Sequence, residues 1–128
     1  MTSIEVPFSI AAALPTLSVI DITNDVSREL ATGGHRDGIV YVTPGADPWV
    51  VRVQEREAGF FCDVEEMLAR VLPFDTPNRI RLLSFLLGSR TEQVPFRASQ
   101  LCLGRWQRVL LVDLQGACRG EWTLTLVG

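Results

Sequence analysis

The chain has 128 residues, of which 47% are hydrophobic and 21% are charged, and its formal net charge is −3. The length predicts one domain spanning residues 1–128, and the composition excludes a disordered chain. All 12 basic residues are arginines, which excludes a P-loop, a Schiff-base enzyme and a lysine general base. Because the arginines are scattered singly along an acidic chain, we expect no nucleic-acid partner.

The first half of the chain predicts short strands around one helix. Thr23 is suited to an N-cap, so the helix is expected to run from there to the glycine pair that begins at Gly33. In the last strand of this half, alternation places Val51, Val53 and Glu55 on one face. The predicted strands span Ile4–Leu14, Leu17–Ile22, Gly38–Thr43 and Trp49–Glu55.

The second half predicts two helices followed by four strands. Apolar residues recur at i, i+3, i+4 and i+7 over Phe60–Leu72, and a shorter apolar helix is expected over Ile80–Leu87. This order does not alternate strand and helix regularly. It predicts an α+β fold, a mainly antiparallel β-sandwich with a few outer helices. The four strands are expected at Thr91–Phe96, Gln100–Leu103, Trp106–Leu114 and Trp122–Val127.

The strand Trp106–Leu114 has an unbroken aliphatic centre that we expect to be buried on both faces. Alternation places Gln107 and Asp113 on the same face of this strand, about 20 Å apart. One chain cannot form a compact acid/base pair from two such distant groups. A site shared between subunits could use each of them separately.

Cysteine, histidine and the N-terminal stretch give further limits. Cys62, Cys102 and Cys118 are widely spaced, and we expect them to be reduced fillers of the core. The only histidine, His35, lies in a glycine-rich turn, so a Ser-His-Asp triad would have to use a solvated loop residue. No His/Cys cluster is present, and no apolar run reaches the roughly 18 residues of a membrane span. We therefore expect a cytoplasmic protein with no metal, no cofactor, no membrane partner and no secretory signal.

Several segments together resemble the YjbQ-like family, which includes proteins described as secondary thiamine-phosphate synthases. The resemblance implies a compact sandwich of jelly-roll character, a homotrimer, and a pocket near a subunit interface at Gln107 and Asp113. Its most specific part is the Leu-Gly-x-Trp-Gln piece. The matching segments are Asp21-Ile22-Thr23, Gly38–Val42, Gln54-Glu55, the helix end Arg70-Val71-Leu72-Pro73, Leu86-Leu87-Gly88-Ser89, Leu103-Gly104-x-Trp106-Gln107, and Asp113 before a turn with Gly116 and Arg119.

The sequence departs from the family's pattern at its histidines. Ala46, Asp47 and Pro48 stand where the family has a His-Thr-Thr motif, and Arg81 stands where its second histidine motif ends. The resemblance implies that those histidines bind a metal or phosphate. Alanine cannot do this, whereas Arg81 is either a surface residue at a helix start or a ligand for an anion.

Three functions stay open on this basis. The leading hypothesis is a diverged, trimeric protein that binds a small anion or serves as a scaffold without the family's metal chemistry. The second is a weak phosphate-directed enzyme of the thiamine-phosphate synthase type, and the third is a subunit of a mixed assembly with intact relatives. Besides a role in a site, Trp106 could pack in the core or at an interface. Glu55 could likewise have a structural role. The candidate ligand-binding residues are Gln107, Arg119, Arg81 and Trp106, and the candidate catalytic residues are Glu55 and Asp113.

Overall fold

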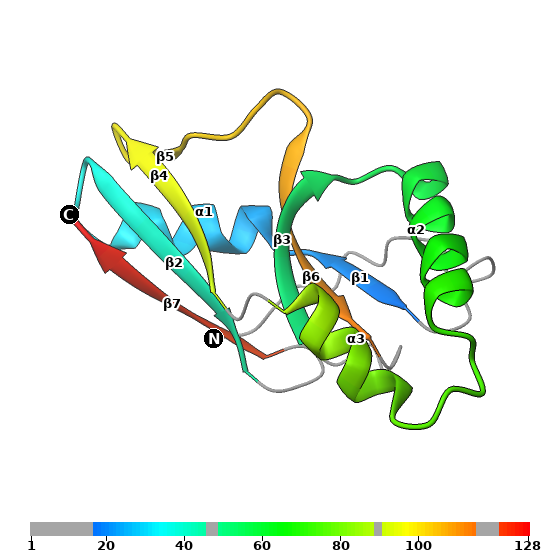
Figure 1. Cartoon of the computed structure of the whole chain (residues 1–128). Coiled ribbons are helices and arrows are strands. Elements are labelled where there is room, and N and C mark those ends of the chain that lie inside the picture. Colours follow the sequence, from blue (N-terminus) through cyan, green and yellow to red (C-terminus); the bar gives the residue numbers. More distant parts are fainter. Residues whose placement is uncertain (1–16, 46–48, 89–90, 115–120) are drawn as a thin grey trace.

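The computed structural model describes residues 17–45, 49–88, 91–114 and 121–128. Within these residues the chain forms three helices and seven strands, and the strands are arranged in two antiparallel sheets (Figure 1). The predicted α+β class is therefore confirmed. The elements are β1 (Ser18–Asp21), α1 (Thr23–Thr32), β2 (Gly38–Pro44), β3 (Trp49–Glu55), α2 (Ala58–Val71), α3 (Arg79–Leu87), β4 (Glu92–Arg97), β5 (Gln100–Leu101), β6 (Gln107–Asp113) and β7 (Trp122–Val127).

Some predicted features lie outside the described residues. These are the strand Ile4–Leu14, the family-motif positions 46–48, and the turn that contains Cys118 and Arg119. In the part of the chain that is described, no helix is both long enough and apolar enough to cross a membrane.

One sheet has the strand order β1-β6-β3, and the other has the order β5-β4-β2-β7. The central strand of the smaller sheet, β6, pairs antiparallel with both of its neighbours. All residues from Val109 to Val112 are buried, which confirms the expectation for its aliphatic centre.

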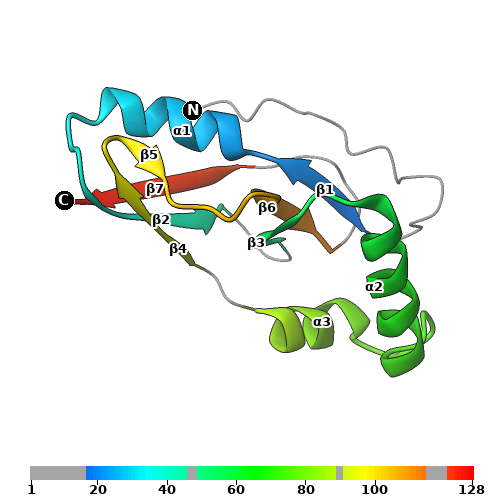
Figure 2. The same ribbon diagram turned by 90° about the horizontal axis from the view of Figure 1, so that it is seen from above.

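Alternation along β6 divides its side chains between two hydrophobic clusters. Figure 2 shows α1 and α3 on opposite sides of this strand. Val109 and Leu111 pack between the two sheets, together with Val26 and Leu30 of α1. The alternate residues Leu110 and Val112 face the other way and pack with α2 and α3, through residues that include Phe61, Leu68 and Leu83. The smaller sheet is thus covered on both faces.

The start of α1 differs from the prediction. The helix begins at Thr23, and the residue at the cap position is Ile22, which makes no side-chain cap bond. Thr23 therefore does not serve as the N-cap. The carboxylate of Asp21, two residues earlier in the chain, accepts a hydrogen bond from the Thr23 amide instead, at 3.0 Å. The expected helix end at Gly33 is confirmed.

The helix α2 begins two residues before its predicted start. The Glu57 carboxylate caps it, accepting hydrogen bonds from the amides of Gly59 at 2.9 Å and Phe60 at 2.6 Å. These bonds satisfy amide groups that otherwise have no partner in the first turn of a helix. The side-chain cap therefore extends the helix to Ala58, ahead of the apolar repeat from which its start was predicted.

The expectation for the cysteines is wrong for Cys102. This residue is exposed where the chain leaves the short strand β5, and Cys62 in α2 is half-buried. Both thiols are free.

Candidate functional site

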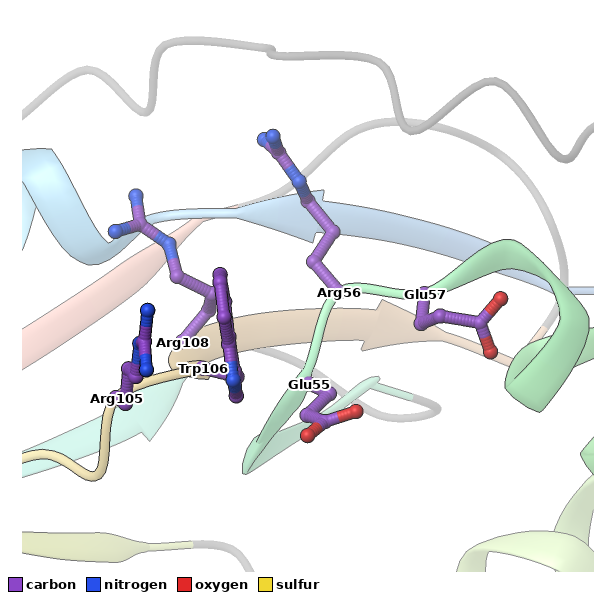
Figure 3. A pocket seen from close by; sticks show the side chains of 6 residues that line it. All are labelled: Glu55, Arg56, Glu57, Arg105, Trp106 and Arg108. Atoms are coloured by element: carbon purple, nitrogen blue, oxygen red, sulfur yellow. The ribbon is translucent and has the colours of Figure 1, made fainter.

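The strongest candidate site lies where β3 ends and β6 begins. In the antiparallel register Glu55 is opposite Gln107, so the segment that follows β3 lies beside the segment that precedes β6. A pocket of about 660 Å³ opens between them (Figure 3). It is lined by Glu55, Arg56, Glu57, Arg105, Trp106 and Arg108.

Behind the pocket stands a buried carboxylate, that of Asp21 at the end of β1, which is only 4% exposed. One of its oxygens, Oδ2, accepts hydrogen bonds from Arg108 Nε at 2.8 Å and from Arg56 Nη1 at 3.3 Å. The other oxygen, Oδ1, accepts from the Thr23 amide at 3.0 Å and from the Thr23 hydroxyl at 2.7 Å. A single carboxylate thereby joins β1, α1, the end of β3 and β6.

The pKa of Asp21 reflects this environment. Burial raises the pKa of the carboxyl, but the hydrogen bonds from Arg108 and Thr23 and the positive charge of Arg108 outweigh it. The pKa consequently lies below its ordinary value of 3.8. Asp21 is therefore ionised at neutral pH, as an acceptor for two guanidinium groups must be.

Thr23 links this carboxylate to the core strand. Its hydroxyl oxygen accepts a hydrogen bond from the Val109 amide at 2.8 Å, while the Ile22 amide donates to the Val109 carbonyl at 2.9 Å. These bonds fix the first residues of β6, and with them Arg108, relative to β1. A backbone held in this way gives the side chains of the pocket a rigid base.

Trp106 supplies the aromatic part of the pocket. Its side chain is 64% exposed, and the Arg105 guanidinium lies over its ring with the Cζ atom 4.9 Å from the ring centroid. This geometry is a cation–π contact, which orients the guanidinium along the ring face. Within the chain, the expectation that Trp106 packs in the core is wrong, and its packing at an interface stays a prediction.

The charges of the pocket are separated in space. Figure 3 shows the Arg56 and Arg108 side chains extending toward β1, while the Glu57 carboxylate points toward α2 and Glu55 lies on another side. Glu57 is engaged by the first turn of α2. Guanidinium groups bind carboxylates and phosphates through paired hydrogen bonds, so the side of the pocket with the arginines is suited to an anion.

Residues 12–128 match the family described as UPF0047 protein YjbQ-like. The chain belongs to this family. A UPF0047 protein of Methanothermobacter thermautotrophicus is 31% identical to this YjbQ-like chain over 109 aligned residues, and the alignment covers 78% of the chain and 76% of the relative. A UPF0047 protein of Archaeoglobus fulgidus is 29% identical over 109 residues, covering 78% and 83%. The crystal structure of a hypothetical protein from Aeropyrum pernix K1 superimposes with a TM-score of 0.74 at 26% identity, covering 88% of this chain and 90% of that one.

The pocket brings together two of the residues predicted for the site of this YjbQ-like protein. Glu55 and Trp106 line it. Gln107 does not, although it is adjacent in sequence. The side-chain oxygen Oε1 of Gln107 accepts a hydrogen bond from the Gly104 amide at 2.6 Å. The backbone amide of Gln107 donates to the Gly104 carbonyl at 3.1 Å. The Gln107 side chain therefore closes the turn that carries Arg105 and Trp106.

The other predicted residues lie elsewhere. Asp113 is at the opposite end of β6, is only 1% exposed and does not line the pocket. Arg81 is exposed on α3 and does not line the pocket. Arg119 lies outside the described residues.

The described residues do not provide a site for a metal of the kind that the family resemblance implies. Arg81 is a permanent cation and cannot ligate one. In the described ranges, no three His, Cys, Asp or Glu side chains are grouped so that they could hold a metal ion.

Sequence reasoning missed most residues of the site. Asp21 drew attention only as part of a segment that resembles the family. Four further residues of the site, which come from the segments around Glu55 and Trp106, were not singled out. Two charged runs in the sequence mark the position of the site. The run Glu-Arg-Glu lies at the end of β3, and the run Arg-Trp-Gln-Arg lies at the start of β6. Their proximity depends on the register of β3 and β6, which neither run reveals. The missed residues are Asp21, Arg56, Glu57, Arg105 and Arg108.

Proposed function

We propose that this YjbQ-like protein binds a small anionic ligand in the pocket between β3 and β6, as a trimer and without metal chemistry. The observation that carries the proposal is that three arginines, Arg56, Arg105 and Arg108, line one pocket. Its volume, about 660 Å³, lies within the range of small-molecule sites. The Trp106 ring adds an exposed flat surface against which an apolar or aromatic part of the ligand can pack.

The test is isothermal titration of the purified protein with inorganic phosphate and with sulfate. We expect Arg105→Gln to weaken binding about tenfold, since it removes a charge-assisted hydrogen-bond donor. Arg97→Gln is the matched control, because Arg97 is an exposed arginine of β4 outside the pocket. No binding by the wild type at millimolar anion, or equal losses in both variants, would refute the proposal. Arg81→Gln tests the other anion site considered from the sequence.

A second candidate function is a weak phosphate-directed enzyme activity. Glu55 favours it, because its carboxylate lines the pocket and forms no hydrogen bond or ion pair with the other described residues. A carboxylate placed beside a bound phosphate can act as a general base. The assay is formation of thiamine phosphate by the wild type and by Glu55→Gln. Turnover that persists unchanged in the variant would remove Glu55 from this role.

Exposed apolar side chains support the proposed self-association. Phe85 on α3 is 88% exposed, its neighbour Leu86 is 54% exposed, and Trp106 is 64% exposed. Large apolar residues of this kind are common where subunits meet. Light scattering at micromolar concentration should give the mass of a trimer, and a monomer would contradict the proposal. Co-expression with an intact relative, followed by purification through one tagged chain, tests the alternative of a mixed assembly. A cytoplasmic location is part of the same proposal.

A further inference from the structure

The structure assigns Asp21 a role in binding although it does not line the pocket. We propose that Asp21 is the positioning residue of the anion site, and that it acts by holding the guanidinium groups of Arg56 and Arg108 before the ligand arrives. This inference rests on the proposed anion binding. Its basis is that one buried carboxylate oxygen accepts from two arginines that belong to different segments.

The two oxygens of Asp21 have separate partners. Oδ1 accepts from the Thr23 amide at 3.0 Å and from the Thr23 hydroxyl at 2.7 Å, and so belongs to the turn between β1 and α1. Oδ2 accepts from Arg108 Nε and Arg56 Nη1, at 2.8 Å and 3.3 Å, and so belongs to the pocket. Because the contacts divide by atom, a substitution can disturb one set while keeping much of the other.

The contact with Arg108 leaves one terminal nitrogen of the guanidinium, Nη1, without a hydrogen-bond partner among the described residues, and this nitrogen is available to a ligand. Asp21 engages the Nε atom, and of the two terminal nitrogens Nη2 makes a longer contact of 3.4 Å with Asn24. The side chains of Arg108 and Arg56 remain 35% and 42% exposed, so both can meet a ligand from solvent. Arginine loses much rotamer freedom when it is fixed. An arginine that is already fixed loses less conformational entropy when the ligand binds, so the free-energy cost of forming the complex is smaller.

The charge of Asp21 acts in the opposite direction. Removing it makes the pocket more positive, which by charge alone favours an anion. Both arginine side chains are partly exposed, however, and salt screens charge in such positions. We therefore expect the loss of order to outweigh the gain in charge.

Asp21→Asn separates these effects. Asparagine keeps Oδ1 for Thr23 but places an NH₂ group, a donor, against two guanidinium groups that can only donate. We expect its affinity for sulfate to fall about tenfold at constant ionic strength. Asp25→Asn is the matched control, since Asp25 is also a buried aspartate that accepts from an arginine, Arg28, but neither of these residues lines the pocket. We expect it to leave the affinity for sulfate near that of the wild type.

NMR of the arginine Nε–H groups gives a readout that a purely structural role would not move. The Arg108 Nε–H proton should exchange slowly with water in the wild type and in Asp25→Asn, and rapidly in Asp21→Asn. Unchanged protection in Asp21→Asn, or sulfate binding as tight as in the wild type, would overturn the inference.

The outcomes distinguish this inference from the proposed function. If the wild type does not bind sulfate, or binds it independently of Arg105, the proposed function fails. If binding depends on Arg105 but not on Asp21, the positioning inference alone fails. Should Asp21→Asn not fold, Asp21→Glu takes its place, because it keeps the negative charge but moves the carboxylate by one methylene group relative to the two guanidinium groups. A tenfold loss in Asp21→Glu would support the inference, and unchanged affinity would overturn it.

Discussion

Asp21→Asn should also lower the free energy of unfolding, by an amount that the contacts of the carboxylate allow us to estimate. The two hydrogen bonds from Thr23 to Oδ1 survive the substitution. The bond from Arg108 at 2.8 Å is lost, and a hydrogen bond to a charged group contributes about 1.5–3 kcal/mol. The contact with Arg56, at 3.3 Å and with a side chain 42% exposed, adds at most about 1 kcal/mol. Because both arginines can turn toward water, neither is stranded, and we expect a loss of about 2–3 kcal/mol at neutral pH.

The decrease in the free energy of unfolding caused by Asp21→Asn should depend on pH, in a direction set by the lowered pKa of Asp21. A carboxyl whose pKa is lower in the folded state stabilises the protein above its unfolded pKa. This contribution disappears as the pH falls through the folded pKa, which lies below 3.8. The difference between wild type and Asp21→Asn should therefore be full at neutral pH and should shrink only in strong acid.

The assay is urea unfolding of both proteins across this pH range, at one fixed protein concentration because self-association adds to stability. Glu66→Gln is the control, since it removes an exposed ion pair with Arg70 whose side chains are 62% and 77% exposed. We expect this control to cost no more than about 0.5 kcal/mol. A loss below about 1 kcal/mol in Asp21→Asn at neutral pH would show that the arginine contacts contribute little, and would refute the estimate.

Three further predictions concern the surroundings of the pocket and its chemistry. Glu57→Ala removes the cap of α2 and should cost about 1 kcal/mol in urea unfolding, whereas no change would mean that water replaces the cap. Gln107→Leu opens the turn at Gly104 and should cost about 0.5–1.5 kcal/mol in the same assay; a stabilised variant would contradict the importance of this bond. Because Ala46 and Arg81 stand where ligands are expected, elemental analysis should find no stoichiometric zinc or nickel, and about one ion per chain would contradict this.

Local patterns in the sequence predicted much of the fold. The strands Trp49–Glu55 and Trp122–Val127 were predicted to the residue, because β-branched and alternating side chains mark them. The aliphatic run in β6 predicted a strand buried on both faces for a similar reason. Errors arose where side chains act on the backbone, as at the caps of α1 and α2. Such bonds depend on rotamers that hydrophobic periodicity does not report.

The candidate site was less accessible to sequence reasoning because its parts are distant in the chain. The Oδ2 atom of Asp21 joins Arg56, 35 residues away, and Arg108, 87 residues away. Nothing in the pattern around Arg108 indicates that its partner lies at the end of β1. Gln107 and Asp113 attracted attention as polar ends of an apolar strand, yet one closes a turn and the other is buried. The polar residues at the two ends of β6 therefore do not line the pocket, although Gln107 lies between two residues that do.

The position of β6 between two hydrophobic clusters has a consequence for how the protein comes apart. Val109 and Leu111 belong to one cluster, and Leu110 and Val112 belong to the other. Neither cluster can open without exposing one face of the same strand, so the two should unfold together as one cooperative unit. Amide hydrogens of β6 should then exchange only through global unfolding, at the slow end of the range for this protein. Arg108 is the second residue of this strand. Its backbone is therefore held by the part of the fold that we expect to unfold last.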